Sequence, residues 1–106
     1  MPSQRPVEYK LKTSVIFSEA RQMFSVLDLD NGHVHQFDVL GKAIVLTLLE
    51  WRTLEDALVN LRSFVSNCSL EVEDEEQYLS VFVEELRQRG LLDVREDDEP
   101  LSRDPP

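Results

Sequence analysis

Two histidines and a single cysteine carry the most reactive side chains of this 106-residue sequence. His33 and His35 would share one face of a strand, because strand side chains alternate, and two imidazoles on one face could bind zinc. Zinc needs three or four ligands, and no third candidate follows at a characteristic spacing. Cys68 could pair with either histidine as a nucleophile, but it is expected at the end of a helix rather than at its start. We interpret Cys68 as a small apolar residue and expect no metal, no cofactor and no catalytic residue, so the protein is not expected to be an enzyme.

The acidic residues between positions 71 and 76 are the other candidate for a cation site. They lack the Asp-x-Asp-x-Asp-Gly spacing of a calcium loop, and the three scattered glycines of the chain form no phosphate-binding loop. Negative charge is favoured in the first turn of a helix, so we interpret the cluster as a solvated helix start. The sequence is therefore more informative about elements that could bind a partner than about groups that could catalyse a reaction.

The elements that position the two histidines are predicted by residues 22–38, QMFSVLDLDNGHVHQFD. Asn31-Gly32 between two apolar segments favours a β-hairpin with a type I′ turn, which would join strands over 22–28 and 33–37. The preceding residues 8–17 alternate apolar and polar side chains and are expected to form a further strand. Together these segments predict a three-stranded antiparallel sheet.

Three helices are expected after this sheet. Asp38 is a suitable N-cap for a helix over Val39 to Trp51, whose run AIVLTLL is apolar nearly all round and should be buried. Thr53 begins a second helix through a capping-box pattern, and a third is expected from about Glu73 to Arg89, with Gly90 as its C′ residue. The prediction is an α+β fold in the order β-β-β-α-α-α.

One domain accommodates these elements, because 106 residues suffice for one modest core. We place this domain at residues 8–92. Residues 1–7 contain two prolines and are expected to form a flexible arm, whereas the acidic, Pro-containing residues 93–106 are expected to form a disordered tail. The N-terminus has no apolar signal core and the single cysteine cannot form an internal disulfide, which favours a cytoplasmic location.

The net charge of the protein indicates which kinds of molecule it could bind. Eleven basic residues face twenty-one acidic ones, and the net charge is -10. Proteins bind nucleic acids through Lys and Arg residues that neutralise phosphates, so DNA and RNA are disfavoured, and an anionic membrane surface is disfavoured for the same reason. No apolar run approaches the roughly 20 residues that span a bilayer. A basic or neutral peptide is the more natural partner, although acidity also aids solubility on its own.

The third predicted strand is where we expect a peptide to bind. Lys10, Lys12 and Pro6 protect the first strand from pairing, whereas HVHQF carries no such residue. A stripe on the third predicted helix mixes apolar and acidic side chains and would form a wall beside this strand, although a half-buried helix surface explains the stripe equally well. The candidate edge residues are His33, Val34, His35, Gln36 and Phe37, and the candidate wall residues are Asp74, Tyr78, Val81, Glu85 and Gln88.

From Phe24 to Leu92 the sequence resembles the PqqD-like domain, the precursor-peptide recognition element of ribosomal peptide natural-product (RiPP) pathways. The matching segments are LDLDNGHVHQFD before an apolar helix, then RTLEDALVNL, then EEQYLSVFVEELRQRGLL. Phe37-Asp38 stands where Leu-Asn is usual in the family, and Trp51-Arg52 replaces the commoner Asp-Gly before Thr53. These departures affect packing and turn chemistry more than the predicted groove.

The resemblance implies a winged-helix-like fold and a non-catalytic protein. It implies that a leader peptide lies as an added strand along the third strand, against the third helix, and that the domain presents the precursor to a processing enzyme. A free-standing domain of this size is most similar to those of lasso-peptide pathways, where the partner is a leader peptidase. It is also similar to the PqqD type of cofactor biosynthesis, where the partner is a radical enzyme. The alternative is a winged-helix-like structural protein, monomeric or homodimeric through the third strand.

Overall fold

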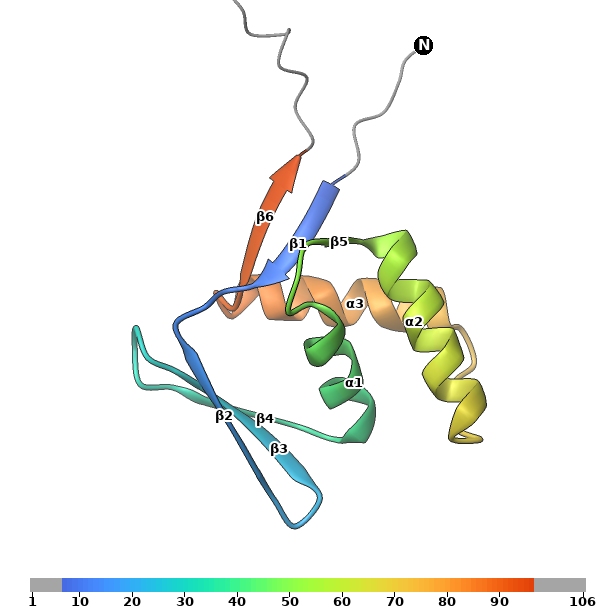
Figure 1. Ribbon diagram of the computed structural model, residues 1–106, viewed down its shortest axis with the longest axis horizontal. Coiled ribbons are helices and arrows are strands. Elements are labelled where there is room, and N and C mark those ends of the chain that lie inside the picture. The colour runs from blue at the N-terminus through green and yellow to red at the C-terminus, as the bar shows by residue number, and fades with distance from the viewer. Residues whose placement is uncertain (1–6, 97–106) are drawn as a thin grey trace, which may run out of the picture.

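The computed structural model describes residues 7–96, which form three helices and two three-stranded antiparallel sheets (Figure 1). The elements in chain order are β1 (Val7–Leu11), β2 (Val15–Ala20), β3 (Met23–Asp28), β4 (Val34–Phe37), α1 (Val39–Thr47), β5 (Arg52–Thr53), α2 (Leu54–Asn67), α3 (Glu75–Gln88) and β6 (Leu92–Glu96). One sheet has the strand order β2-β3-β4 and the other β5-β1-β6. The α+β class is confirmed, but the simple order of three strands followed by three helices is not observed.

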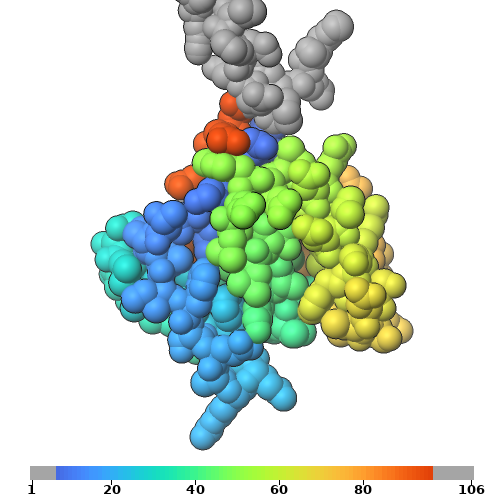
Figure 2. Space-filling model, in the orientation of Figure 1, coloured from blue at the N-terminus to red at the C-terminus, as the bar shows by residue number. Residues whose placement is uncertain are grey.

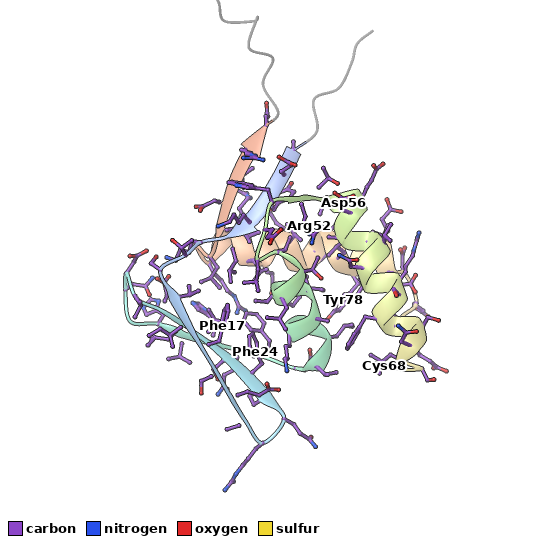
Figure 3. All side chains as sticks on the ribbon, in the orientation of Figure 1. Phe17, Phe24, Arg52, Asp56, Cys68 and Tyr78 are labelled. Carbon is purple, nitrogen blue, oxygen red and sulfur yellow. The ribbon has the colours of Figure 1, made fainter. Side chains whose placement is uncertain are left out.

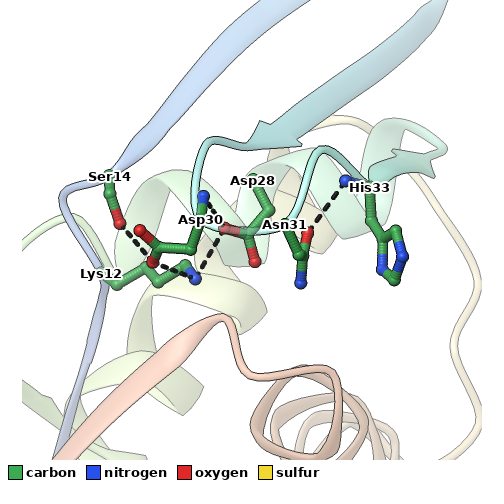
Figure 4. A network of polar contacts seen from close by, with 6 residues as sticks. All are labelled: Lys12, Ser14, Asp28, Asp30, Asn31 and His33. Atoms are coloured by element: carbon green, nitrogen blue, oxygen red, sulfur yellow. Dashed lines mark hydrogen bonds and ion pairs between the residues drawn. The ribbon is translucent and has the colours of Figure 1, made fainter.

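The segment predicted as the first strand is divided between the two sheets. β1 lies between β5 and β6, the chain bends over residues 12–14, and β2 then pairs with β3. Lys12 holds this bend, because its Nζ lies 2.7 Å from Asp28 Oδ1 and 2.9 Å from Asp30 Oδ2 (Figure 4). The Asp28 carboxylate is fully buried, so this ion pair joins the end of β1 to the end of β3. Apolar and polar side chains continue to alternate through residues 12–14, so the sequence pattern did not predict the bend.

The tight turn of the β2–β3–β4 sheet lies one hairpin earlier than predicted. Arg21 and Gln22 have φ angles of 55° and 68° and join β2 to β3, so both central residues adopt the positive φ that a type I′ turn requires. The predicted type I′ turn at Asn31-Gly32 is wrong, because β3 and β4 are joined by a longer loop in which Gly32 has φ 79°. The Asn31 side chain stabilises this loop by accepting a hydrogen bond from the His33 N–H at 2.9 Å (Figure 4).

The helix starts follow the predicted caps. Asp38 accepts a hydrogen bond from the Gly41 N–H at 2.9 Å, and Thr53 accepts one from the Asp56 N–H at 3.1 Å. α1 ends at Thr47 rather than near Trp51, because the chain beyond it returns to pair with β1 as β5. Gly90 has φ 76° immediately after α3, as expected for a C′ glycine.

A single apolar core joins the helices to both sheets. α1 packs against β3 and β4, and α2 packs against both α1 and α3. The buried apolar residues are Leu11, Phe24, Val26, Phe37, Ile44, Val45, Leu48, Ala57, Leu61, Val65, Leu79, Val83, Leu86, Leu91 and Leu92. None of the helices in residues 7–96 combines the length and apolar character needed to cross a membrane.

The chain after α3 differs from the expected disordered tail. Residues 92–96 form β6, which pairs with β1 from Leu11↔Leu92 to Val7↔Glu96. Arg95 reinforces this pairing, because its Nε lies 2.7 Å from Glu8 Oε1 and its guanidinium lies 4.3 Å from the centre of the Trp51 ring. The rest of the expected tail, residues 97–106, and residues 1–6 of the expected arm lie outside the described residues.

Candidate functional site

β4 forms one edge of the β2–β3–β4 sheet within residues 7–96. The Asp28 N–H donates to the His33 carbonyl oxygen at 2.9 Å, so the main-chain groups of these two residues face each other across the two strands. Such pairs alternate with non-bonded pairs along an antiparallel ladder, so the main-chain groups of His35 point towards β3. Those of Val34 and Gln36 point away from β3 and are open to a further strand.

A pocket of about 330 Å³ lies between β4 and α3. Aromatic rings form much of its lining: the ring centres of Phe37 and Phe82 are 5.6 Å apart, and Tyr78 stacks on Phe82 with 6.1 Å between centres. Val81 also lines the pocket and is 55% exposed. The remaining lining residues are Gln36, Asp38, Glu85 and Arg89. An apolar side chain carried by a strand next to β4 could enter this space.

Gly41 explains how α1 approaches the pocket so closely. A Cβ atom at this position would lie 2.9 Å from the Cβ of Phe37 and 3.1 Å from Cζ of Phe82. Glycine therefore lets the first turn of α1 pack directly against the Cβ of Phe37 and the ring of Phe82, which restricts the positions of both residues in the pocket.

The pocket carries both signs of charge at one end. Arg89 lies 3.7 Å from the Glu85 carboxylate and 5.9 Å from the centre of the Phe37 ring. At the other end, burial raises the pKa of the Tyr78 phenol, and the Asp38 carboxylate adds to the rise. Tyr78 is therefore neutral at physiological pH and can donate a hydrogen bond from its hydroxyl group.

Five of the ten predicted site residues line the pocket: Gln36, Phe37, Tyr78, Val81 and Glu85. Val34 lies on the same open edge but outside the pocket lining. Asp74 instead caps α3, where its side chain accepts a hydrogen bond from the Gln77 N–H at 3.1 Å. Gln88 donates to Glu84 at 3.2 Å on the exposed surface. The wall is thus shorter than the stripe that helical spacing suggested.

The two histidines do not belong to the pocket lining. His35 lies opposite Val26 on the face of the sheet that points to the core, and its Nε2 is buried without a hydrogen-bond partner among the described residues. Burial lowers the pKa of His35, and nearby Arg89 lowers it further, so the imidazole is neutral at physiological pH. His33 is exposed, with its ring centre 6.4 Å from that of His35. Within residues 7–96, no group of three or more His, Cys, Asp or Glu side chains could hold a metal ion.

Three pocket residues were missed by the sequence analysis. Asp38 was assigned only to the helix cap and Arg89 only to the helix end, and Phe82 was not among the predicted wall residues. A signal was present, because Tyr78, Phe82, Glu85 and Arg89 recur at intervals of three and four and therefore share one face of α3.

The opposite edge of the same sheet is formed by β2, not by the lysine-bearing segment. Lys10 and Lys12 lie in or just after β1, the central strand of the other sheet, so they do not protect this edge as expected. β2 contains neither Lys nor Pro, and the outward-pointing main-chain groups belong to Val15, Phe17 and Glu19. An unpaired edge therefore does not distinguish β4 from β2, whereas the aromatic-lined pocket beside β4 does.

These features define an α+β domain in which an open strand edge borders an aromatic-lined pocket. No protein-family model matches the sequence, and no curated protein matches it. Among solved structures, the fold is similar to that of a lasso peptide synthetase B1 complexed with the leader peptide. The TM-score is 0.62 and the sequence identity 22%, over 79% of this chain and 95% of that chain. This similarity establishes a shared fold.

Proposed function

We propose that this protein binds the leader segment of a ribosomally made precursor peptide, presents it to a processing enzyme and has no catalytic role of its own. One observation carries the proposal: the outward main-chain groups of Val34 and Gln36 lie on a strand that borders the pocket of about 330 Å³. Supporting observations are the shared fold with a protein solved in complex with its leader peptide and the PqqD-like sequence segments.

The leader would bind as an added strand along β4. Its main chain would form hydrogen bonds with Val34 and Gln36, and alternate side chains would point towards α3 and the pocket. Each main-chain bond contributes about 1 kcal/mol, whereas ordering a disordered leader costs about 2–5 kcal/mol. The bonds at two residues therefore only offset the ordering. Net affinity depends on an apolar side chain in the pocket, which contributes about 1.5–3 kcal/mol when fully buried.

We further propose that the pathway makes a lasso peptide and that the partner enzyme is a leader peptidase. The solved neighbour favours this pathway over the cofactor pathway of PqqD, in which the partner is a radical enzyme. A winged-helix-like, PqqD-like classification fits the predicted strand-to-helix order from Phe24 onwards, where the third predicted strand leads into the first helix. In this account the protein acts as a peptide chaperone that holds the leader in an extended form.

Calorimetric titration with the leader of a precursor encoded beside this gene tests the proposal. We expect saturable binding with one site per chain, and no binding of a scrambled leader of the same composition. Sedimentation with and without the peptide separates leader binding from the alternative, in which β4 pairs with a second copy. Absence of saturable leader binding, or a dimer that the leader does not dissociate, would contradict the proposal.

A further inference from the structure

One side of α1 is apolar and yet uncovered. The apolar run of this helix was expected to be buried, but within the helix only Gly41, Ile44 and Val45 are buried. On the opposite side, by helical spacing, Val39 is 55% exposed and Leu46 is 39% exposed. A helix that is apolar nearly all round normally has neighbours on every side. In the part of the chain that the structure describes, α1 therefore lacks a neighbour on its outer side.

A pocket of about 320 Å³ lies between α1 and α2 on this outer side. Its apolar lining residues are Val39, Ala43, Ile44, Leu46, Leu61 and Phe64. Two of its polar residues already have partners: Lys42 Nζ lies 2.7 Å from Glu19 Oε2, and the Thr47 hydroxyl donates to the Ala43 carbonyl oxygen at 3.0 Å. A cavity of about 150 Å³ holds one benzene ring, so this pocket has room for two large apolar side chains. We name it the α1–α2 pocket.

The α1–α2 pocket and the pocket beside β4 lie on different sides of α1. Gly41 faces Phe37 at the pocket beside β4, whereas Val39 and Leu46 line the α1–α2 pocket. Figure 2 shows α1 at the centre of one face of the molecule, between β2 and α2. Phe17 of β2 is 38% exposed and is directed towards α1, so it extends the apolar surface on that side (Figure 3). The two pockets can therefore be occupied at the same time.

The surroundings of the α1–α2 pocket favour a helix as its occupant. The main-chain groups of α1 and α2 are paired within each helix, so an added strand would gain no ladder of hydrogen bonds here. A helix satisfies its own main-chain groups and presents only side chains. Two apolar residues one turn apart on a helix lie about 5–6 Å from each other, so both can enter a single pocket.

The charges around the α1–α2 pocket favour a basic partner. Lys42 is the basic residue of the lining, and Glu19 neutralises it. Asp56 lies one turn before Asn60 on the same face of α2 and takes part in no ion pair among the described residues. A second copy would bring its own net charge of -10, and residues 97–106 include four acidic residues and one leucine. Like charges repel, so both of these occupants are disfavoured.

We propose that the processing enzyme docks at the α1–α2 pocket by inserting two apolar side chains of a basic amphipathic helix. This inference rests on the proposed function, because the enzyme must hold this protein while the leader occupies β4. Docking between α1 and α2 leaves the β4 edge free, so the enzyme and the leader bind without competing. The precursor residues beyond the bound leader segment then remain available to the active site of the enzyme.

The test uses the full chain, its leader and the purified candidate peptidase encoded beside the precursor gene. Leu46→Lys places a charge in the pocket lining, whereas Ala43→Leu fills the pocket without changing the charge. We expect both variants to bind the leader with unchanged affinity and to lose about tenfold in affinity for the enzyme. Val59→Lys is the matched control, because Val59 is 66% exposed on α2 and lies outside the pocket lining. Added salt should weaken enzyme binding, and less so in Asp56→Asn.

Four results would overturn the inference. The first is an enzyme that does not bind the wild type, and the second is Leu46→Lys and Ala43→Leu proteins that bind it as tightly as the wild type. The third is weaker enzyme binding under saturating leader, which would show that the two compete. The fourth is a change in sedimentation of the free protein caused by Leu46→Lys, which would assign the α1–α2 pocket to self-association. Failure of the wild type to bind the leader would instead contradict the proposed function, and is measured by titration without the enzyme.

Discussion

The two edge strands of the β2–β3–β4 sheet differ in what lies beside them rather than in how open they are. β2 and β4 both present main-chain groups that no other strand within residues 7–96 pairs with. Beside β4, however, Phe37, Tyr78 and Phe82 line a pocket. Main-chain hydrogen bonds are the same for every peptide sequence, so an open edge alone provides no selectivity. The pocket beside β4 is therefore what makes β4, rather than β2, the candidate binding site.

The pocket exists because of close packing between elements distant in sequence. Phe37 is the last residue of β4, and the next residue caps α1, so strand and helix meet at a fixed angle. Gly41 then allows the first turn of α1 to contact both Phe37 and Phe82. On the β2 side, Glu19 forms an ion pair of 2.7 Å with Lys42 of the same helix. α1 thus contacts both edges, through aromatic rings at one and through charge at the other.

The strongest test of this comparison places proline on each edge. Gln36→Pro removes an outward N–H next to the pocket and should weaken leader binding by about 2 kcal/mol, because two main-chain bonds are lost or distorted. Glu19→Pro removes an outward N–H on β2 and should leave leader binding unchanged. Calorimetry measures both affinities, with Gln36→Ala and Glu19→Ala as side-chain controls. Equal losses at the two edges would show that the pocket does not select β4.

A charge on the pocket surface should have the next largest effect. Val81 is 55% exposed, so Val81→Asp should leave the fold intact. The carboxylate would have to lose water when an apolar leader side chain enters, and we expect a loss of about 1.5 kcal/mol in binding free energy. Val59→Asp on α2 is the matched control. If both aspartate variants bind the leader like the wild type, the pocket does not take part in binding.

Gly41→Ala tests whether α1 fixes the aromatic rings. The added methyl group must displace Phe37 or Phe82, and this overpacking should lower the free energy of unfolding by about 1 kcal/mol despite the better helix propensity of alanine. Leader affinity should fall in parallel, because the rings line the pocket. Urea denaturation and calorimetry give the two quantities. A variant that is stabilised and binds normally would refute this role of Gly41.

The smallest expected effect is a pH dependence of the free energy of unfolding, caused by His35 of β4. Burial, aided by Arg89, lowers the pKa of His35 below its usual value of 6.5. Below about pH 6.5 the unfolded chain therefore binds a proton that the folded protein does not, and the free energy of unfolding falls as the pH is lowered. His35→Gln should flatten this dependence between pH 8 and 5 in urea denaturation. The exposed His33→Gln variant is the control, and an unchanged slope in His35→Gln would contradict the assignment.

Much of the local structure could be predicted from the sequence, because its signals lie within a few residues. Asp38 and Thr53 cap their helices as expected, and Gly90 follows α3. The division of residues 8–17 between two sheets could not be predicted, because it depends on the ion pair between Lys12 and Asp28, which are far apart in the chain. The pairing of β5 and β6 with β1 is long-range for the same reason.

The candidate site was predictable to a similar extent. The third predicted strand indeed lies at an edge, and helical spacing brought Tyr78, Val81 and Glu85 to the pocket. Spacing alone could not show where the stripe on α3 stops facing β4, so Asp74 and Gln88 were included and Arg89 was not. It also could not reveal that β2, with no lysine, forms the second edge. Both errors concern how elements pack, which no local pattern contains.

Amide hydrogen exchange with and without the leader tests the central claim most directly, because it reports on individual main-chain groups. Strand addition at β4 predicts that the leader slows exchange at the Val34 and Gln36 amides and leaves those of Val15, Phe17 and Glu19 unchanged. Protection of the β2 amides, or no change at Val34 and Gln36 under saturating leader, would contradict it.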